Sequence, residues 1–251
     1  MQNFLCKTIT IIIYSDFFKS MAHNFHIVTS FNFKGYEKYG KNFLETFKSK
    51  DVKVYVGTED DLSLFPKYKN VKFFPIDKKM SERIFSQIVN TLPDEQKNSY
   101  QFQAHRFCFK VQALASNDHL PDDGYRVWID ADVVFKKEIN AFDLNKICED
   151  NNLTFLGRDV WWHTETGFII FKLNEYGKTF LFRWLWYYTT GRFILLTEWN
   201  DSYIFDVIRK EFASKKIKNL SSGIEVRDVW PETILNEYMT HLKGTLKNES
   251  F

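Results

Sequence analysis

Strand-like and helix-like segments alternate along this chain, and this alternation limits the possible folds more than any other feature of the sequence. Short stretches rich in β-branched and aromatic residues predict strands, and stretches with apolar residues three and four apart predict helices. Strands joined through helices of ten or more residues form a mostly parallel sheet with helices on both faces, so we expect an α/β fold. The predicted strands are 26–31, 51–57, 71–76, 125–130, 154–157 and 167–173, and the predicted helices are 36–48, 82–92, 100–116, 175–189 and 202–212.

Composition excludes several classes of protein. The 251 residues carry 34 Lys and Arg against 32 Asp and Glu, a net charge of +2, which is too balanced for a protein that binds nucleic acid. Cys6, Cys108 and Cys148 are far apart and form no zinc motif or disulfide framework. They fit a reducing compartment, so we expect a cytoplasmic protein. No apolar run approaches the ~20 residues of a membrane span.

The first twenty residues differ from the rest of the chain. Residues 1–20 hold one lysine and a short apolar stretch, and Met21 begins a segment that enters the first predicted strand almost at once. We interpret 1–20 as an extension upstream of the true start; a poor signal peptide and an extra edge strand are the alternatives. No repeat or change of composition divides the remainder, which predicts a single domain over 21–251.

The most informative segment is 126–135, RVWIDADVVF, in which an apolar strand delivers Asp130 and Asp132. In an extended backbone, side chains two positions apart point to the same side, so the two carboxylates converge and repel each other unless a cation joins them. Mg²⁺ and Mn²⁺ prefer such oxygen ligands. We therefore predict a divalent-metal site here; the alternative is an Asx turn with two solvated aspartates.

Other polar residues are expected at the same edge of the sheet, because ligands of open α/β sheets bind outside the carboxyl ends of the strands. Thr29 and Ser30 lie near the end of the first predicted strand, so we expect them at the same edge of the sheet as Asp130. Arg106 and Lys110 are four positions apart on a predicted helix, which gives a basic stripe placed to meet a nucleotide phosphate or ribose.

The stretch 107–135, FCFKVQALASNDHLPDDGYRVWIDADVVF, resembles the core of the GT-A-fold nucleotide-sugar glycosyltransferases. It has their lysine-bearing helix, which carries Lys110, then an apolar strand and a DxD motif. The same string, DADVV, also fits the first motif of haloacid-dehalogenase-type phosphatases, in which Asp130 would be the nucleophile. That family places its motif near the start of the domain, whereas about 130 residues precede it here, so the position favours the transferase.

A second element strengthens this resemblance. The segment 241–247, HLKGTLK, is similar to the HxxGxxK element of the glycogenin and bacterial galactosyltransferase type, although the Pro-Trp that usually follows is replaced by Asn-Glu. The resemblance implies that His241 completes the metal site with the two aspartates. It also implies that Lys243, Gly244 and Lys247 bind the donor, with a lysine on its diphosphate.

Two later loops supply the remaining residues that the resemblance implies. In the family, an acid placed like Asp201 contacts the acceptor and in inverting members removes its proton. Glu165 is a second catalytic candidate. The expected contacts to the acceptor and the sugars are Trp161, Trp162, His163 and Trp199.

Together these features predict a metal-dependent glycosyltransferase that moves a hexose from a nucleotide sugar, UDP-linked, to an acceptor hydroxyl. The acceptor would be a carbohydrate, a lipid-linked molecule or a protein, and the cofactor Mn²⁺ or Mg²⁺. Two alternatives stay open: the phosphatase that uses Asp130 as nucleophile, and a catalytically inactive relative that binds carbohydrate or nucleotide.

Overall fold

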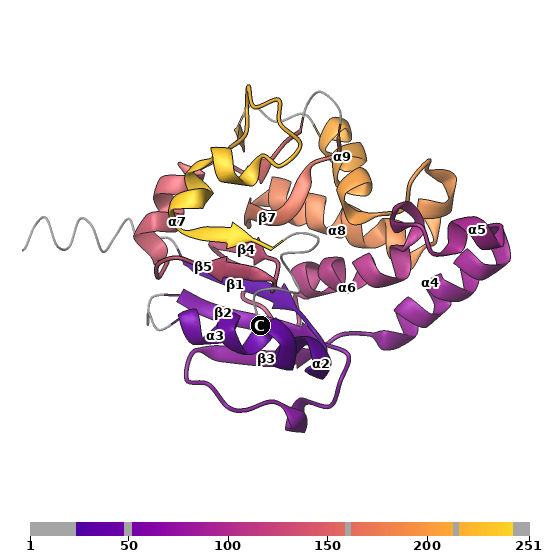
Figure 1. Cartoon of the computed structure of the whole chain (residues 1–251), viewed down its shortest axis with the longest axis horizontal. Helices are drawn as coiled ribbons and strands as arrows, with labels where there is room; N and C mark the ends of the chain where they lie inside the picture. Colours follow the sequence, from indigo (N-terminus) through magenta and orange to yellow (C-terminus); the bar gives the residue numbers. More distant parts are fainter. Residues whose placement is uncertain (1–23, 48–51, 159–161, 213–215, 243–251) are drawn as a thin grey trace, which may run out of the picture.

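A computed structural model describes residues 24–47, 52–158, 162–212 and 216–242 (Figure 1). The expected extension 1–20 lies outside these ranges, and so do four predicted site residues, Trp161, Lys243, Gly244 and Lys247. None of the helices in these ranges combines the length and the apolar character that crossing a membrane requires.

The elements of the described ranges follow the predicted alternation. The strands are β1 (Phe25–Ser30), β2 (Val52–Thr58), β3 (Val71–Pro75), β4 (Tyr125–Ile129), β5 (Val133–Phe135), β6 (Leu153–Leu156), β7 (Glu165–Lys172), β8 (Ile217–Asn219) and β9 (Met239–His241). The α-helices are α2 (Phe33–Gly35), α3 (Lys41–Thr46), α4 (Lys78–Thr91), α5 (Asp94–Lys97), α6 (Ala104–Ala115), α7 (Ala141–Cys148), α8 (Glu175–Thr189) and α9 (Asp201–Glu211). A π-helical turn, η1 (Tyr36–Gly40), and the 3₁₀ turns η2 (Leu62–Leu64), η3 (Tyr100–Phe102), η4 (Arg192–Leu195), η5 (Trp230–Glu232) and η6 (Ile234–Glu237) complete the set.

Seven strands form one sheet in the order β3-β2-β1-β4-β7-β6-β8, and β5 pairs with β9 in a separate two-stranded sheet. Within the large sheet, β1 is parallel to β2 and β4, β2 to β3, and β6 to β8. The exception is β7, which runs antiparallel to β4 and β6. Only 157–164 join β6 to β7, fewer than the dozen or more residues that a parallel crossover needs. The predicted α/β class with a mostly parallel sheet is confirmed.

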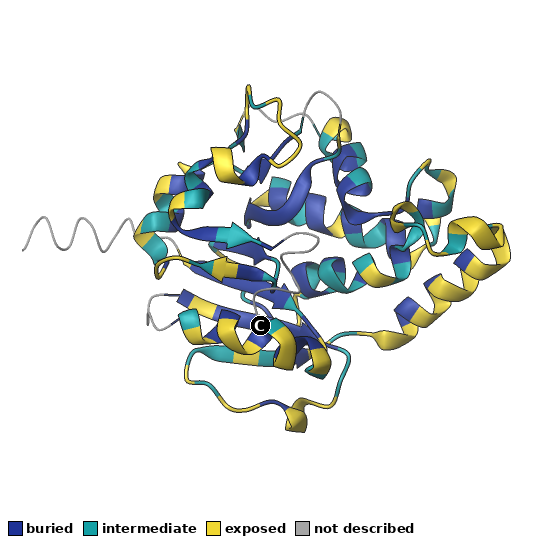
Figure 2. Cartoon of the chain, viewed as in Figure 1, coloured by how far each residue is buried: buried dark blue, intermediate teal, exposed yellow. Residues whose placement is uncertain are grey.

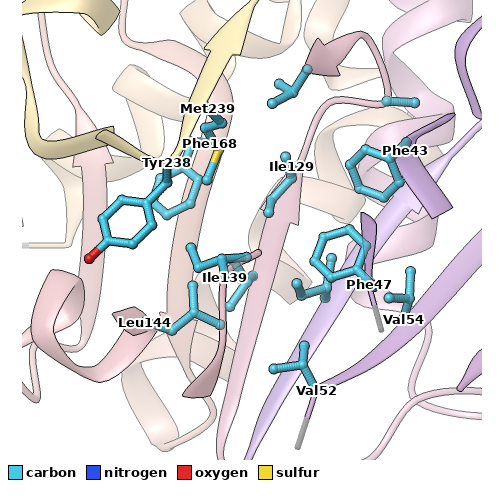
Figure 3. Packing of buried hydrophobic residues seen from close by; sticks show 14 of the residues in the cluster. Phe43, Phe47, Val52, Val54, Ile129, Ile139, Leu144, Phe168, Tyr238 and Met239 are labelled. Atoms are coloured by element: carbon cyan, nitrogen blue, oxygen red, sulfur yellow. The ribbon is translucent and has the colours of Figure 1, made fainter. Parts of the chain in front are cut away.

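Side chains of the sheet alternate between two cores. Ile27 and Ile129 belong to the core covered by α3 and α7, whereas Val28 and Trp128 belong to the core covered by α4, α6, α8 and α9. The central strands are therefore buried on both faces (Figure 2). Figure 3 shows the first core, where aromatic side chains from α3 and from the C-terminal segment pack beside β4.

Asparagine or aspartate side chains cap the N-termini of five helices, α2, α4, α7, α8 and α9. Asp77 accepts a hydrogen bond from the backbone N–H of Lys79 (2.9 Å), and for this reason α4 begins four residues before the predicted start at residue 82. Asn200 accepts from the backbone N–H of Tyr203 (2.8 Å) and caps α9. The predicted helix 100–116 begins instead at Ala104, because η3 forms a 3₁₀ turn before it.

Gly177 allows the first turn of α8 to pack directly on the end of β7. A Cβ atom added there would lie 2.0 Å from the carbonyl oxygen of Lys172, so the backbone would have to move. We expect Gly177→Ala to lower the free energy of unfolding by about 2 kcal/mol or more, measured by urea denaturation. The matched control is Gly223→Ala, which meets no atom within 4 Å and strains only a backbone with φ of +78°, for about 1 kcal/mol. Equal losses in the two variants would contradict this account.

His26 makes stability depend on pH. The side chain lies in β1, largely buried, with Nε2 3.8 Å from Oδ1 of Asp123. Burial lowers the pKa of His26, and Asp123 reverses only part of that effect. Since the unfolded chain then binds the proton more readily, this contribution to stability is present above about pH 6.5 and is lost as pH falls below it. We expect the loss of stability between pH 7.5 and 5 to be smaller in His26→Phe than in the parent; equal losses would count against this role.

Candidate metal and donor site

Asp130 follows β4 directly, and two contacts fix its position. Its backbone N–H donates to the carbonyl oxygen of Gly167 in β7 (2.9 Å), which extends the sheet pairing by one residue. The indole Nε1 of Trp128 donates to Oδ1 of Asp130 (2.6 Å), as side chains two positions apart on one side of a strand can do. The carboxylate is thus held at the carboxyl end of the parallel part of the sheet.

His241 comes from the other end of the chain and reaches the aspartates because β9 pairs with β5. Val133 lies opposite His241 in this pair, and the N–H of Leu242 donates to the carbonyl oxygen of Asp132 (3.2 Å). Nε2 of His241 lies 3.2 Å from Oδ1 of Asp132 and 3.7 Å from Oδ2 of Asp130. The three residues each offer a ligand atom within 4.8 Å of the others. The structure therefore brings together all three predicted metal ligands.

Close packing holds the imidazole of His241 in this position. The ring of Trp230 lies against it at a centroid distance of 5.1 Å. On another side is Gly167, where an added Cβ would come within 3.0 Å of Cε1 of His241 and 3.2 Å of the Trp230 ring. A side chain at this position would push the imidazole or the indole aside, so Gly167 lets β7 pass close under the ring of His241.

The charges around His241 favour its protonated form. Burial lowers the pKa of His241, but the hydrogen bond to Asp132 and the charges of Glu165 and Asp130 outweigh burial, so the pKa lies above its ordinary value. For Asp130, burial raises the pKa, and Asp132 raises it further against the opposing effect of Lys110. The two shifts have different main causes: acidic neighbours raise the pKa of His241, and burial raises the pKa of Asp130. A cation bound between the two aspartates would stabilise their charged forms.

Lys110 lies in the site, but its bonding differs from the prediction. The side chain is 11% exposed, and Nζ lies 3.2 Å from Oδ1 of Asp130 and 2.6 Å from Oδ2 of Asp201. Nζ also donates to the carbonyl oxygen and the hydroxyl of Thr166 (3.0 and 3.2 Å). Burial opposes the charge on Lys110, yet the two carboxylates raise its pKa above the ordinary value. The ammonium thus links two carboxylates of the protein, whereas the sequence predicted a contact with nucleotide.

Two predictions for residues at the start of α9 and just before it need correction. Asp201 was expected to face the acceptor, but it is 1% exposed and its carboxylate is engaged by Lys110 and by the hydroxyl of Thr166 (2.7 Å). Trp199 was expected to contact sugar, but it is 3% exposed and packs edge-on against Phe102 and Phe193 in the core. Both residues are buried because Trp199 packs against η3 and Asp201 binds Lys110 of α6.

The remaining predicted residues of this region lie at the start of β7 and in the loop before it. Glu165 accepts a hydrogen bond from Arg158 (2.9 Å), and its Oε1 lies 3.7 Å from Nδ1 of His241. Trp162 is 50% exposed, and the guanidinium of Arg227 lies 4.6 Å from the centre of its ring. His163 is also partly exposed.

The other predicted donor contacts differ in their access to solvent. Thr29 is fully buried in β1, which corrects the expectation that it touches a ligand, because this end of the strand is covered. Ser30 is half-buried at the end of the same strand. Arg106 is exposed and donates to the side chain of Gln103 (2.8 Å).

Asp132 lines a pocket of about 510 Å³ that lies between η1 and α3 on one side and the β5–β9 pair on the other. Its other walls include Tyr39, Asn42, Ala131 and Thr240. A larger pocket, of about 740 Å³, is lined by the first residues of β2 and β3 and therefore lies at the opposite edge of the sheet, away from the acidic cluster.

Sequence reasoning missed the residues that support the cluster. Their roles depend on contacts between distant segments, so no local motif identifies them. The one sequence signal for a site at this place was weak: the predicted strand that became β7 follows polar residues, and β7 itself begins with them. These supporting residues are Trp128, Arg158, Thr166, Gly167 and Trp230.

No protein-family model and no curated protein matches the chain. Solved structures do. One is the glycosyltransferase GlyE of Streptococcus pneumoniae TIGR4, with a TM-score of 0.43, 13% identity, and coverage of 78% of this chain and 45% of GlyE. This chain therefore spans less than half of GlyE.

Two further solved structures match over most of their own length. Mouse xyloside xylosyltransferase 1, in its apo form, has a TM-score of 0.47 and 11% identity, with coverage of 85% of this chain and 91% of that protein. A glycosyltransferase involved in the glycosylation of the major capsid of PBCV-1 has a TM-score of 0.48 and 9% identity, with coverage of 90% and 99%. All three are glycosyltransferases, as the resemblance of the motifs leads one to expect. Since the TM-scores stay below 0.5, a function for this chain has to be inferred from its own side chains.

Proposed function

We propose that this chain is a metal-dependent glycosyltransferase that transfers a hexose from a UDP-linked donor to a hydroxyl group. The observation that carries the proposal is the convergence of Asp130, Asp132 and His241 at the carboxyl end of β4. Ligands of open α/β sheets bind at this edge. The adjoining pocket of about 510 Å³ has the size of a small-molecule site.

The three side chains fit a hard divalent cation, Mn²⁺ or Mg²⁺. In an octahedral site with bonds of ~2.1 Å, neighbouring ligand atoms are about 3 Å apart. The distances of 3.2 and 3.7 Å from Nε2 of His241 to the carboxylate oxygens of Asp132 and Asp130 are close to this value. Three protein ligands also leave positions for oxygens of a diphosphate. When bound, such a cation stabilises the negative charge that collects on a departing diphosphate.

The transfer exchanges one bond for another. The bond between C1 of the sugar and the diphosphate oxygen breaks, and its electron pair stays on the diphosphate. A bond forms between C1 and the acceptor oxygen, and the hydroxyl proton is released. The protein contributes by holding charge in place before the reaction: Lys110 fixes Asp130 and offsets part of the negative charge that the diphosphate would otherwise meet.

Lys243, Gly244 and Lys247, which follow His241 in the sequence, are proposed to bind the donor diphosphate. Lysine ammonium groups suit phosphate oxygens, and a glycine allows close approach of the backbone. Trp162 and His163, both at least partly exposed, are available to the sugar and the acceptor. Glu165 is largely buried against Arg158 and His241, and we propose that it acts from there.

Asp132→Ala tests the metal site without requiring a substrate. The variant should fold with a melting temperature close to that of the parent, because relief of the repulsion from Asp130 offsets the lost contact to His241. At a Mn²⁺ concentration of about 100 times the dissociation constant, the parent should gain about 2.7 kcal/mol of stability, and the variant should gain far less. Asp118→Ala, an exposed aspartate in the loop after α6, should respond as the parent does. Equal stabilisation of Asp132→Ala and the parent would mean that Mn²⁺ binds elsewhere.

Turnover of nucleotide sugars tests the reaction itself. Release of UDP from UDP-hexoses in the presence of Mn²⁺ should be detectable with the parent and should fall by about 100-fold or more with EDTA or in Asp132→Ala. Undiminished turnover in EDTA would argue against the proposal. Two outcomes would select the alternatives: phosphorylation of Asp130 by phosphate analogues indicates the phosphatase, and UDP binding without any turnover indicates an inactive relative.

A further inference from the structure

Three segments that are distant in sequence meet at Glu198, beside the acidic cluster. The backbone N–H of Trp199 donates to the carbonyl oxygen of Gln101 (2.7 Å), which ties the loop before α9 to η3. Nε2 of Gln101 donates to Oε1 of Glu198 (3.4 Å), and Nε2 of His163 lies 3.3 Å from the same oxygen. These contacts set a carboxylate, an amide and an imidazole side by side, all at least partly open to solvent.

Tyr100 adds an aromatic ring next to these groups. The residue is 60% exposed, and its ring packs edge-on against Phe107 with centroids 5.0 Å apart. Phe107 lies one turn before Lys110 on α6, so Tyr100 packs on the helix that carries the ammonium bound to Asp130. Burial of the hydroxyl, with the charges of Asp201 and other carboxylates of the cluster, raises the pKa of Tyr100. The ring is thus largely open to solvent and lies against α6.

We infer that Tyr100, Gln101, His163 and Glu198, which we call the Glu198 rim, form the acceptor subsite and that the acceptor is a neutral carbohydrate. This inference rests on the proposed function. The Glu198 rim lies on the side of the sheet covered by α6 and α9, whereas the pocket at Asp132 lies on the side of α3. A donor and an acceptor can therefore approach Asp130 from different sides.

The chemistry of the Glu198 rim selects the class of acceptor. An exposed aromatic face packs against the C–H groups of a sugar ring, and a carboxylate, an amide and an imidazole bind its hydroxyls. The charges that face His163 are Glu198 and Asp206, whose oxygen lies 4.0 Å from Nδ1, and Asp206 is itself paired with Arg209 (3.1 Å). Because Arg209 offsets Asp206, the charge that faces His163 is chiefly that of Glu198, which would repel a sugar phosphate or another anion.

Transfer assays with a panel of acceptors test this inference. UDP-hexose and Mn²⁺ are supplied with p-nitrophenyl glycosides of the common hexoses and xylose, and in parallel with the matching sugar 1-phosphates. We expect the neutral glycosides to be used and the phosphates not. Glu198→Gln and Tyr100→Ala should each raise the KM for the glycoside by about tenfold or more, and Tyr100→Phe, which keeps the ring, should recover most of that loss.

Two variants serve as matched controls away from the Glu198 rim. Glu82→Gln changes an exposed glutamate on α4, and Phe142→Ala removes an exposed ring on α7; both should keep the KM of the parent. The inference is overturned if Glu198→Gln and Tyr100→Ala keep the KM of the parent for the glycoside, or if the sugar 1-phosphates are the better acceptors. A parent that shows no stabilisation by Mn²⁺ and UDP would instead overturn the proposed function, and the inference with it.

Discussion

Repulsion between Asp130 and Asp132 is the constraint on which the rest of this structure depends. Two carboxylates placed two residues apart at the end of a buried strand can converge only where positive charge is supplied. The fold brings that charge from both sides of the sheet: α6 contributes the ammonium of Lys110, and β9 contributes the imidazole of His241. Even so, the pKa of Asp130 stays above its ordinary value, mainly because the carboxylate is buried and also because it lies beside Asp132.

The surrounding elements keep this cluster assembled. Two apolar cores, one on each face of the sheet, fix β4 and β7 relative to α6. The β5–β9 pair then delivers His241 to the carboxylates, and the absence of a side chain at Gly167 makes room for its ring. Because the protein holds these charges in place at the cost of their mutual repulsion, binding of a cation there would be coupled to stability.

Local sequence patterns were sufficient for six of the seven strands of the large sheet, for most helices and for the position of the two aspartates, since periodicity and an apolar strand ending in DxD are local signals. The short strands β5, β8 and β9 were not predicted. His241 was found only through a motif resemblance. The direction of β7, the pairing of β5 with β9 and the bonding of Lys110 depend on contacts between distant segments, which no local pattern encodes. For the same reason Thr29, Trp199 and Asp201 were expected at a surface, although tertiary packing buries them.

Anomalous diffraction from crystals grown with Mn²⁺ and UDP would test the central claim most directly, because it locates the metal independently of any assay. The account predicts one strong manganese peak bonded at ~2.1–2.2 Å to Asp130, Asp132 and Nε2 of His241, with diphosphate oxygens completing the coordination. A manganese peak that does not contact Asp132 and His241, or well-occupied UDP without manganese at these residues, would contradict it.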